Sequence, residues 1–133
     1  FNKFIKMQPN HSRAHFGLGN ALMMKGQLDL AMLEYRLSGK LDPTFALPYM
    51  NMANIQMQTK NISAAIENYE KALKVNPRLP AVHLSLGMIY HQFMNNAPKA
   101  LSYLKESLRL NPNQQGVARL KSLITELENK QPA

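Results

Sequence analysis

The chain has 133 residues, 45% of them hydrophobic, which is a size and content typical of one folded domain. It contains no cysteine and only short apolar runs, so disulfides, thiolate metal sites and a membrane-spanning helix are excluded. Its net charge of +8 can favour nucleic acid, anionic membrane or acidic protein partners, but the basic residues stand singly and identify none of them.

Residues 1–9 have the pattern of the end of a helix that Pro9 closes. Because the chain begins at Phe1 in the middle of this pattern, we expect that it belongs to a longer protein. The absence of cysteine favours the cytoplasm but leaves the compartment open.

The stretch from Ser12 to Pro43 is a unit that the rest of the chain repeats. Two amphipathic runs lie on either side of Lys25-Gly26, and a proline closes each copy at intervals of 34 or 35 residues. Matched residues recur at the same spacing and form columns. These columns are His15, Tyr49 and His83; Leu18, Met52 and Leu86; Gly19, Ala53 and Gly87; Ala31, Ala65 and Ala100; Tyr35, Tyr69 and Leu104; Ser38, Ala72 and Ser107; and Leu41, Val75 and Leu110.

The small-residue columns predict that two helices of each unit cross closely. Gly19 faces Ala31 in this interpretation, and the other two copies of the unit also have small residues at both places. Larger residues in the neighbouring columns would fill the space around each crossing. Each proline would end the second helix, because the residue before a proline avoids the helical conformation.

These columns resemble the tetratricopeptide repeat (TPR) family over nearly the whole chain. The resemblance implies an all-α solenoid of antiparallel helix pairs. The expected divisions are the end of a preceding repeat helix at 1–9, repeats at 10–43, 44–77 and 78–112, and a capping helix with a tail at 113–133. The residues that carry the resemblance are His15, Leu18, Gly19, Leu22, Gly26, Ala31, Tyr35, Ser38 and Pro43; Tyr49, Met52, Ala53, Ala65, Tyr69, Ala72 and Pro77; and His83, Leu86, Gly87, Tyr90, Ala100, Leu104, Ser107 and Pro112.

The chain also departs from the family pattern. The glycine between the two helices occurs only at Gly26, and Lys60 and Met94 stand at the equivalent places. The third repeat has one extra residue, and there we expect Asn96 or Asn95 to cap the second helix, with Pro98 in its first turn.

A last apolar stripe follows Pro112, with Val117, Leu120, Ile124 and Leu127 at helical spacing. We expect one helix that covers the third repeat with this face and exposes the other, as a terminal capping element does. The domain would then end at the C-terminus.

In the TPR family the first helices line a concave groove, and one face of each first helix here lies outside the core columns. The resemblance therefore implies that this face binds a peptide or an amphipathic helix of another protein, because exposed apolar patches mark interaction sites and methionine adapts to varied partners. We expect Phe16, Asn20 and Met23 to be unnecessary for packing. The alternative is that missing upstream repeats or another part of the protein fill the groove. The candidate partner-binding residues are Arg13, Phe16, Asn20, Met23, Leu47, Met50, Asn51, Asn54, Met57, Leu84, Met88 and His91.

Asn20, Asn51 and Asn54 resemble asparagines with which TPR grooves hold a peptide backbone. The carboxylate clamp of chaperone-binding TPR domains needs cations beside them, but Phe16, Ala81 and Ser85 stand at those places. Without cations a buried carboxylate lacks its charge partner, so we reject the clamp.

Basic residues recur along the second helices. This surface could bind an acidic partner, RNA or an anionic membrane, or it could be a solvated face whose lysines complement helix dipoles. The second interpretation is favoured, since nucleic-acid modules pair basic residues with exposed aromatics. The residues are Arg36, Lys40, Lys71, Lys74, Lys105 and Arg109.

The sequence contains no signature of catalysis. His11 and His15 have metal-ligand spacing, but no glutamate lies between them as in a zincin helix, and His15 belongs to a repeat column. No phosphate loop, activated nucleophile or paired carboxylates occur. We therefore expect a non-catalytic scaffold or adaptor with no cofactor and no metal, in an assembly factor or a larger complex. A TPR segment of a larger enzyme is the alternative.

Overall fold

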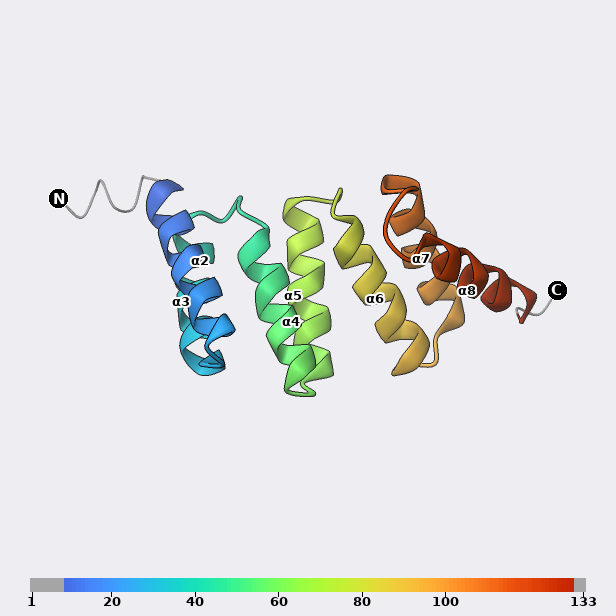
Figure 1. Cartoon of the computed structure of the whole chain (residues 1–133), viewed down its shortest axis with the longest axis horizontal. Coiled ribbons are helices and arrows are strands. Elements are labelled where there is room, and N and C mark those ends of the chain that lie inside the picture. Colours follow the sequence, from blue (N-terminus) through green and yellow to red (C-terminus); the bar gives the residue numbers. More distant parts are fainter. Residues whose placement is uncertain (1–8, 131–133) are drawn as a thin grey trace. The chain divides into compact units, whose positions relative to one another are not determined.

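The computed structural model describes residues 9–130, which contain seven helices and no strand (Figure 1). The helices are α2 (Pro9–Met24), α3 (Leu28–Leu41), α4 (Leu47–Gln58), α5 (Ile62–Val75), α6 (Pro80–Gln92), α7 (Ala97–Leu110) and α8 (Val117–Asn129). They pair as α2 with α3, α4 with α5 and α6 with α7, which confirms the all-α solenoid of helix pairs. The chain divides into two compact units, Phe1–Pro77 (unit 1) and Arg78–Ala133 (unit 2).

The prolines that close the repeats act as predicted. The second helices α3, α5 and α7 end at Leu41, Val75 and Leu110, each two residues before a proline. The expected helix end at 1–9 lies outside the described residues, except for Pro9. The structure places Pro9 in α2.

Paired helices cross closely at the small-residue columns. A Cβ built on Gly19 would lie 2.7 Å from the Tyr35 ring, and one built on Gly87 would lie 2.5 Å from a Leu104 methyl group. Ala31 and Tyr35 of α3 are fully buried and form a core cluster with Met52 and Ile55 of α4. The crossings therefore depend on a first helix that lacks side-chain bulk at this column.

Serines reinforce two of these crossings. Ser12 Oγ donates to the Ser38 carbonyl at 2.8 Å, and Ser38 Oγ donates to the Ser12 carbonyl at 2.7 Å. In unit 2, Ser107 Oγ donates to the Pro80 carbonyl at 2.9 Å, which is the same pair of repeat positions. Hydrogen bonds therefore join the helices where the serine column approaches the first helix.

A residue with positive φ lies in the turn of each helix pair. Gly26 and Lys60, which the alignment of columns makes equivalent, take this conformation with φ of 81° and 65°. In the third pair the residue is Asn95, with φ of 48°. The assignment of Met94 is wrong, because the extra residue moves the turn by one position and asparagine tolerates positive φ better than methionine. Asn96 caps α7 as predicted, since its side chain accepts a hydrogen bond from the Lys99 amide.

The stripe on α8 is buried as predicted except at Val117, which is half-buried. Leu120, Ile124 and Leu127 are buried, and α8 contacts α7. The prediction fails for Leu18, which is 48% exposed although the equivalent Met52 is 5% exposed. Met52 packs against α3, whereas no helix precedes α2 among the described residues.

Candidate partner-binding surface

The predicted site residues belong to two separate surfaces. Nine of them lie on α2 and α4 and form the first-helix surface of unit 1, whereas Leu84, Met88 and His91 lie on α6 in unit 2. Arg13 and Asn54 are exposed, and the other ten are half-buried. The apolar side chains are therefore partly packed and partly open to a partner.

An aromatic corner anchors one end of the first-helix surface. Phe16 and Phe45 meet edge to face with ring centroids 5.1 Å apart, and the Arg13 guanidinium lies 4.5 Å from the centre of the Phe45 ring. Such a contact between a cation and an aromatic ring is favourable. Sequence reasoning missed Phe45, although a large apolar residue recurs one repeat later as Leu79.

The expectation that Phe16, Asn20 and Met23 are unnecessary for packing is wrong. Phe16 and Met23 pack against the core cluster, and Phe16 also contacts the Tyr35 ring with centroids 5.7 Å apart. Asn20 accepts a hydrogen bond from Tyr35. A helix has 3.6 residues per turn, so the outer face of α2 borders its core face and both share these side chains.

A hydrogen-bonded network fixes the central asparagines. Tyr35 Oη donates to Asn20 Oδ1 at 2.5 Å, and Asn51 Nδ2 donates to Asn20 Oδ1 at 2.9 Å and to Tyr35 Oη at 3.3 Å. Burial raises the pKa of Tyr35 above its ordinary value, while the hydrogen bond from Asn51 opposes this shift. Tyr35 is therefore a neutral donor at physiological pH.

The network leaves one donor and one acceptor unused. Asn20 Nδ2 and Asn51 Oδ1 have no hydrogen-bond partner among residues 9–130. A peptide group offers the complementary acceptor and donor. Because the network fixes both amides, a chain that binds there would not have to order them.

The rest of the first-helix surface is apolar apart from Asn54. Asn54 accepts a hydrogen bond from Tyr69, which is the equivalent of the Tyr35–Asn20 contact one repeat later. Leu47, Met50 and Met57 are half-buried on α4. Apolar side chains therefore accompany both asparagines on α4.

In unit 2, α6 and α8 enclose a hollow of about 240 Å³. Leu84 and Met88 of α6 line it together with Leu120 and Leu123 of α8, and its wall includes Arg119. His91 does not line this hollow. Sequence reasoning missed Leu123, which lies one residue before the buried Ile124 of the α8 stripe. Apolar side chains of the capping helix α8 and of α6 therefore line the same hollow.

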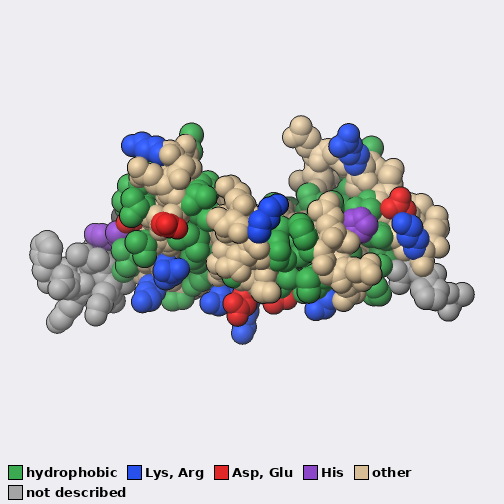
Figure 2. Space-filling model, turned by 90° about the horizontal axis from the view of Figure 1, so that it is seen from below, with side chains coloured by type: hydrophobic (Ala, Val, Ile, Leu, Met, Phe, Trp, Pro, Cys, Tyr) green, Lys and Arg blue, Asp and Glu red, His purple; other side chains and the backbone are tan. Residues whose placement is uncertain are grey.

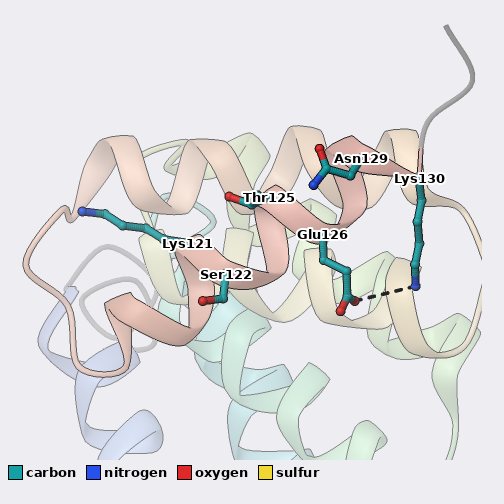
Figure 3. A pocket seen from close by; sticks show the side chains of 6 residues that line it. All are labelled: Lys121, Ser122, Thr125, Glu126, Asn129 and Lys130. Atoms are coloured by element: carbon teal, nitrogen blue, oxygen red, sulfur yellow. Dashed lines mark ion pairs between the residues drawn. The ribbon is translucent and has the colours of Figure 1, made fainter.

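A second hollow, of about 560 Å³, lies along the outer face of α8 (Figure 3). All its lining side chains are exposed and come from this one helix and its C-terminal residue. The figure shows Glu126 and Lys130 facing each other, with their charged atoms 3.8 Å apart. This is the solvated side of the capping helix, and it carries no arrangement that would hold a ligand.

On the face that Figure 2 shows, charged side chains lie among exposed hydrophobic ones. In residues 9–130, no three His, Asp or Glu side chains gather as metal ligands would. Over the same residues, every helix is too short or too polar to cross a membrane.

Glu106 and Arg109 form an ion pair at 2.5 Å, which lowers the pKa of Glu106.

Family models confirm the resemblance. Models described as tetratricopeptide repeat match residues 1–32 and 80–114, and one described as TPR repeat matches residues 53–92. The chain is a tetratricopeptide repeat protein.

Three curated relatives are similar over most of this chain. Protein CTR9 homolog of Arabidopsis thaliana is 27% identical over 78% of the chain, human Tetratricopeptide repeat protein 6 is 25% identical over 84%, and mouse Sperm-associated antigen 1 is 30% identical over 87%. The aligned part is 10%, 21% and 13% of these relatives, so the chain spans only a small share of their length.

Two solved TPR structures have the same fold. The first TPR of Spaghetti (RPAP3), solved with an HSP90 peptide, superposes with a TM-score of 0.79 at 17% identity and covers 94% of this chain and 96% of that one. The N-terminal domain of stress-induced protein-1 from C. elegans superposes with a TM-score of 0.77 at 21% identity, with 90% and 96% covered.

Proposed function

We propose that this TPR protein is a non-catalytic adaptor that holds a segment of another protein on the first-helix surface of unit 1. The observation that carries the proposal is the fixed Asn20–Asn51 pair, with its unused donor and acceptor. It would bind one peptide group of the partner, while Met23, Met50 and Met57 contact apolar side chains on either side. The solved RPAP3 domain with its HSP90 peptide supports a peptide as the class of partner.

The apolar contacts would supply most of the affinity. Burying one large apolar side chain contributes roughly 1.5–3 kcal/mol before the costs of association. Three or four such anchors are enough for a Kd on the order of 1 μM. Because these contacts carry no charge, binding should change little with salt concentration. Strong salt dependence would instead indicate binding of RNA or an acidic membrane to the basic residues.

The partner should not be a chain terminus held by its carboxylate. Phe16, Ala81 and Ser85 stand where a carboxylate clamp needs cations, and Phe16 is packed in the aromatic corner. A clamp would therefore need cations at three positions where this chain has none. An internal segment or an amphipathic helix with two or three apolar side chains fits the surface better.

The proposal can be tested by capturing partners from a lysate of the source cells with the immobilised full-length protein, followed by mass spectrometry. The double variant Met50→Glu/Met57→Glu should lose at least about 90% of the specifically captured protein, because it places two charges among the apolar contacts. The control Ser63→Glu/Ser102→Glu adds the same charge at exposed positions on α5 and α7. Equal capture by both variants, with unchanged far-UV circular dichroism, would refute the proposal.

A sharper variant removes only the unused donor. Asn20→Asp keeps the Oδ1 acceptor for Tyr35 and Asn51 but replaces Nδ2 with a carboxylate oxygen. Loss of one hydrogen bond and repulsion of the peptide carbonyl should weaken binding of a captured partner by about tenfold or more. Ser63→Glu is the control for the added charge. Unchanged affinity of Asn20→Asp would show that the asparagine pair does not bind the peptide backbone.

A further inference from the structure

We propose that unit 1 has a second binding site, a hollow bounded by the second helices α3 and α5, which accepts a short acidic segment of protein. The site, called here the outer channel, consists of two adjoining hollows of about 330 and 480 Å³. They share Met32, Arg36 and Gln56, so together they follow the length of α3.

The floor and wall of the outer channel are packed in place. Met32 and Met52 line its floor, and Met52 is buried in the core cluster. Gln56 of α4 accepts a hydrogen bond from Asn68 Nδ2 of α5 at 2.8 Å, which fixes the wall between these helices. An incoming chain would therefore meet a preformed apolar surface with amide groups beside it.

Three cations line the hollow of about 330 Å³, which is the more highly charged end of the channel. Arg36 and Lys40 come from α3 and Lys71 from α5, against a single acid, Glu67. None of the three cations forms an ion pair among residues 9–130. Lys40 lies in the last turn of its helix and complements the helix dipole there, but Arg36 lies a full turn earlier. The dipole therefore does not account for the cluster.

The third repeat provides an internal comparison. Lys105 and Arg109 occupy the repeat positions of Arg36 and Lys40. Lys105 pairs with Glu128 at 2.6 Å and Arg109 pairs with Glu106 at 2.5 Å. Acids of unit 2 thus neutralise the same two positions that stay uncompensated around the outer channel. An acid from another molecule would therefore meet cations in the channel that no ion pair among residues 9–130 neutralises, unlike those at the same positions of the third repeat.

The other end of the channel differs in character. Asp29 lines it together with Leu28 and Leu33, and Leu33 is 54% exposed. The distance along α3 from Leu28 to Lys40 is about 18 Å, at 1.5 Å per residue, which an extended peptide spans with five or six residues. The fitting segment is therefore apolar at one end, over Leu33 and Met32, and acidic at the other, beside Lys40 and Lys71.

The lining favours protein over nucleic acid. Tyr49 is the one aromatic residue that lines either hollow, so successive bases would have no series of rings on which to stack. A membrane surface would contact exposed residues but would not enter a channel that ends on buried Met52. The test must therefore distinguish binding of an acidic peptide from binding of RNA or of vesicles.

The test is an NMR titration of the ¹⁵N-labelled chain with the amidated peptide LLGEEE and its uncharged counterpart LLGQQQ, at low salt. LLGEEE should shift the amides of Met32, Arg36 and Lys71, and LLGQQQ should bind at least about tenfold more weakly. The variant Arg36→Gln/Lys40→Gln should weaken LLGEEE binding by about tenfold. The matched control Lys105→Gln/Arg109→Gln, with the same loss of charge at the same repeat positions, should change it less than about twofold.

Three results would overturn the proposal: no shift of the channel amides at saturating LLGEEE, equal losses in both double variants, or tighter Arg36-dependent binding of poly-U RNA or phosphatidylserine vesicles. Arg36, Lys40, Lys105 and Arg109 are exposed, so the substitutions should leave the fold intact. Met50→Glu/Met57→Glu should leave LLGEEE binding unchanged. The outer channel and the first-helix surface can therefore fail independently.

Discussion

The two units differ in the side chains that meet where the second helix of a repeat packs on the first. Where the second helix places its largest core side chain against the first helix, unit 1 uses a hydrogen-bonded pair and unit 2 an apolar pair. The equivalent pairs are Tyr35–Asn20 and Tyr69–Asn54 in unit 1 and Leu104–Met88 in unit 2. Both columns change together, because a buried hydroxyl requires a partner that a leucine does not. The chemistry of the core therefore determines which side chain the first-helix surface can present.

This difference separates the two surfaces. In unit 1 the tyrosine fixes Asn20, whose Nδ2 has no hydrogen-bond partner among the described residues. In unit 2 the same position is free for Met88, which lines an apolar hollow with α8. The equivalent position on the first helix therefore carries a polar side chain in unit 1 and an apolar one in unit 2, together with the change from tyrosine to leucine in the core.

The largest effect should come from filling the helix crossings. Gly19→Ala would press a methyl group against the Tyr35 ring, which its hydrogen bonds hold in place, and should cost about 3 kcal/mol of unfolding free energy. Gly87→Ala would place a methyl group 2.5 Å from Leu104 Cδ2 and 3.2 Å from the Leu104 backbone nitrogen. An aliphatic side chain that no hydrogen bond holds can shift more readily than Tyr35, so this substitution should cost less, about 2 kcal/mol. Urea unfolding followed by circular dichroism measures both.

Gly17→Ala is the control for these substitutions, because no atom lies within 4 Å of a Cβ built on this helical, exposed glycine. It should stabilise the protein by about 0.5–1 kcal/mol. An equal cost at Gly19 and Gly87 would show that the hydrogen bonds of Tyr35 do not stiffen the first crossing.

Converting unit 2 to the chemistry of unit 1 should show that the two columns depend on each other. Leu104→Tyr buries a hydroxyl beside Met88 and should cost about 2 kcal/mol. Adding Met88→Asn supplies the acceptor and should recover about 1 kcal/mol. A thermal-unfolding double-mutant cycle gives the coupling energy. If the double variant were no more stable than Leu104→Tyr alone, the two columns would not depend on each other.

Removing the hydroxyl groups within unit 1 should have smaller and unequal effects. Tyr35→Phe removes the donor to Asn20 Oδ1 and one of the two acceptors of Asn51 Nδ2. Both amides are half-buried, so the substitution should cost about 1.5 kcal/mol. Tyr69→Phe should cost about 0.5 kcal/mol, because exposed Asn54 can bond to water instead. Equal costs, measured by urea unfolding, would mean that exposure of the asparagine does not matter.

The smallest effect should appear at high pH. Burial raises the pKa of Tyr35 above its ordinary 10.0, so the folded chain holds this proton more tightly than the unfolded chain. The resulting stability is complete below the unfolded pKa and is lost as pH rises toward the folded pKa. Between about pH 9 and about pH 11, Tyr35→Phe should therefore lose less unfolding free energy than the unsubstituted protein. Parallel pH profiles would contradict this.

The core of each repeat could be read from the sequence because every column is seen three times. Ala31, Ala65 and Ala100 are all fully buried, as is Leu104 in the aromatic column. Leu18 is the exception, since its burial depends on a preceding helix and not on its own repeat. Periodicity thus identifies the side of a helix that faces a neighbour, but not whether a neighbour is present.

The candidate surface was less predictable. Its residues follow from helical spacing, but the hydrogen bonds that fix Asn20 and Asn51 depend on how closely α2 and α4 approach. The packing of Phe16 depends on Phe45, which lies in a connection that the repeat columns do not include. The sequence does contain one signal of the hydrogen bonds. Where the third repeat has Leu104 in place of tyrosine, it also has Met88 in place of asparagine.

The turns between paired helices bear on the order in which the chain folds. Lys60 holds a left-handed conformation that costs a residue with a side chain on the order of 1 kcal/mol, whereas Gly26 adopts it freely. A solenoid can nucleate at any repeat and spread to its neighbours. We therefore expect the α2–α3 hairpin, closed by glycine and by the Ser12–Ser38 hydrogen bonds, to form first and to serve as the template on which the α4–α5 hairpin assembles.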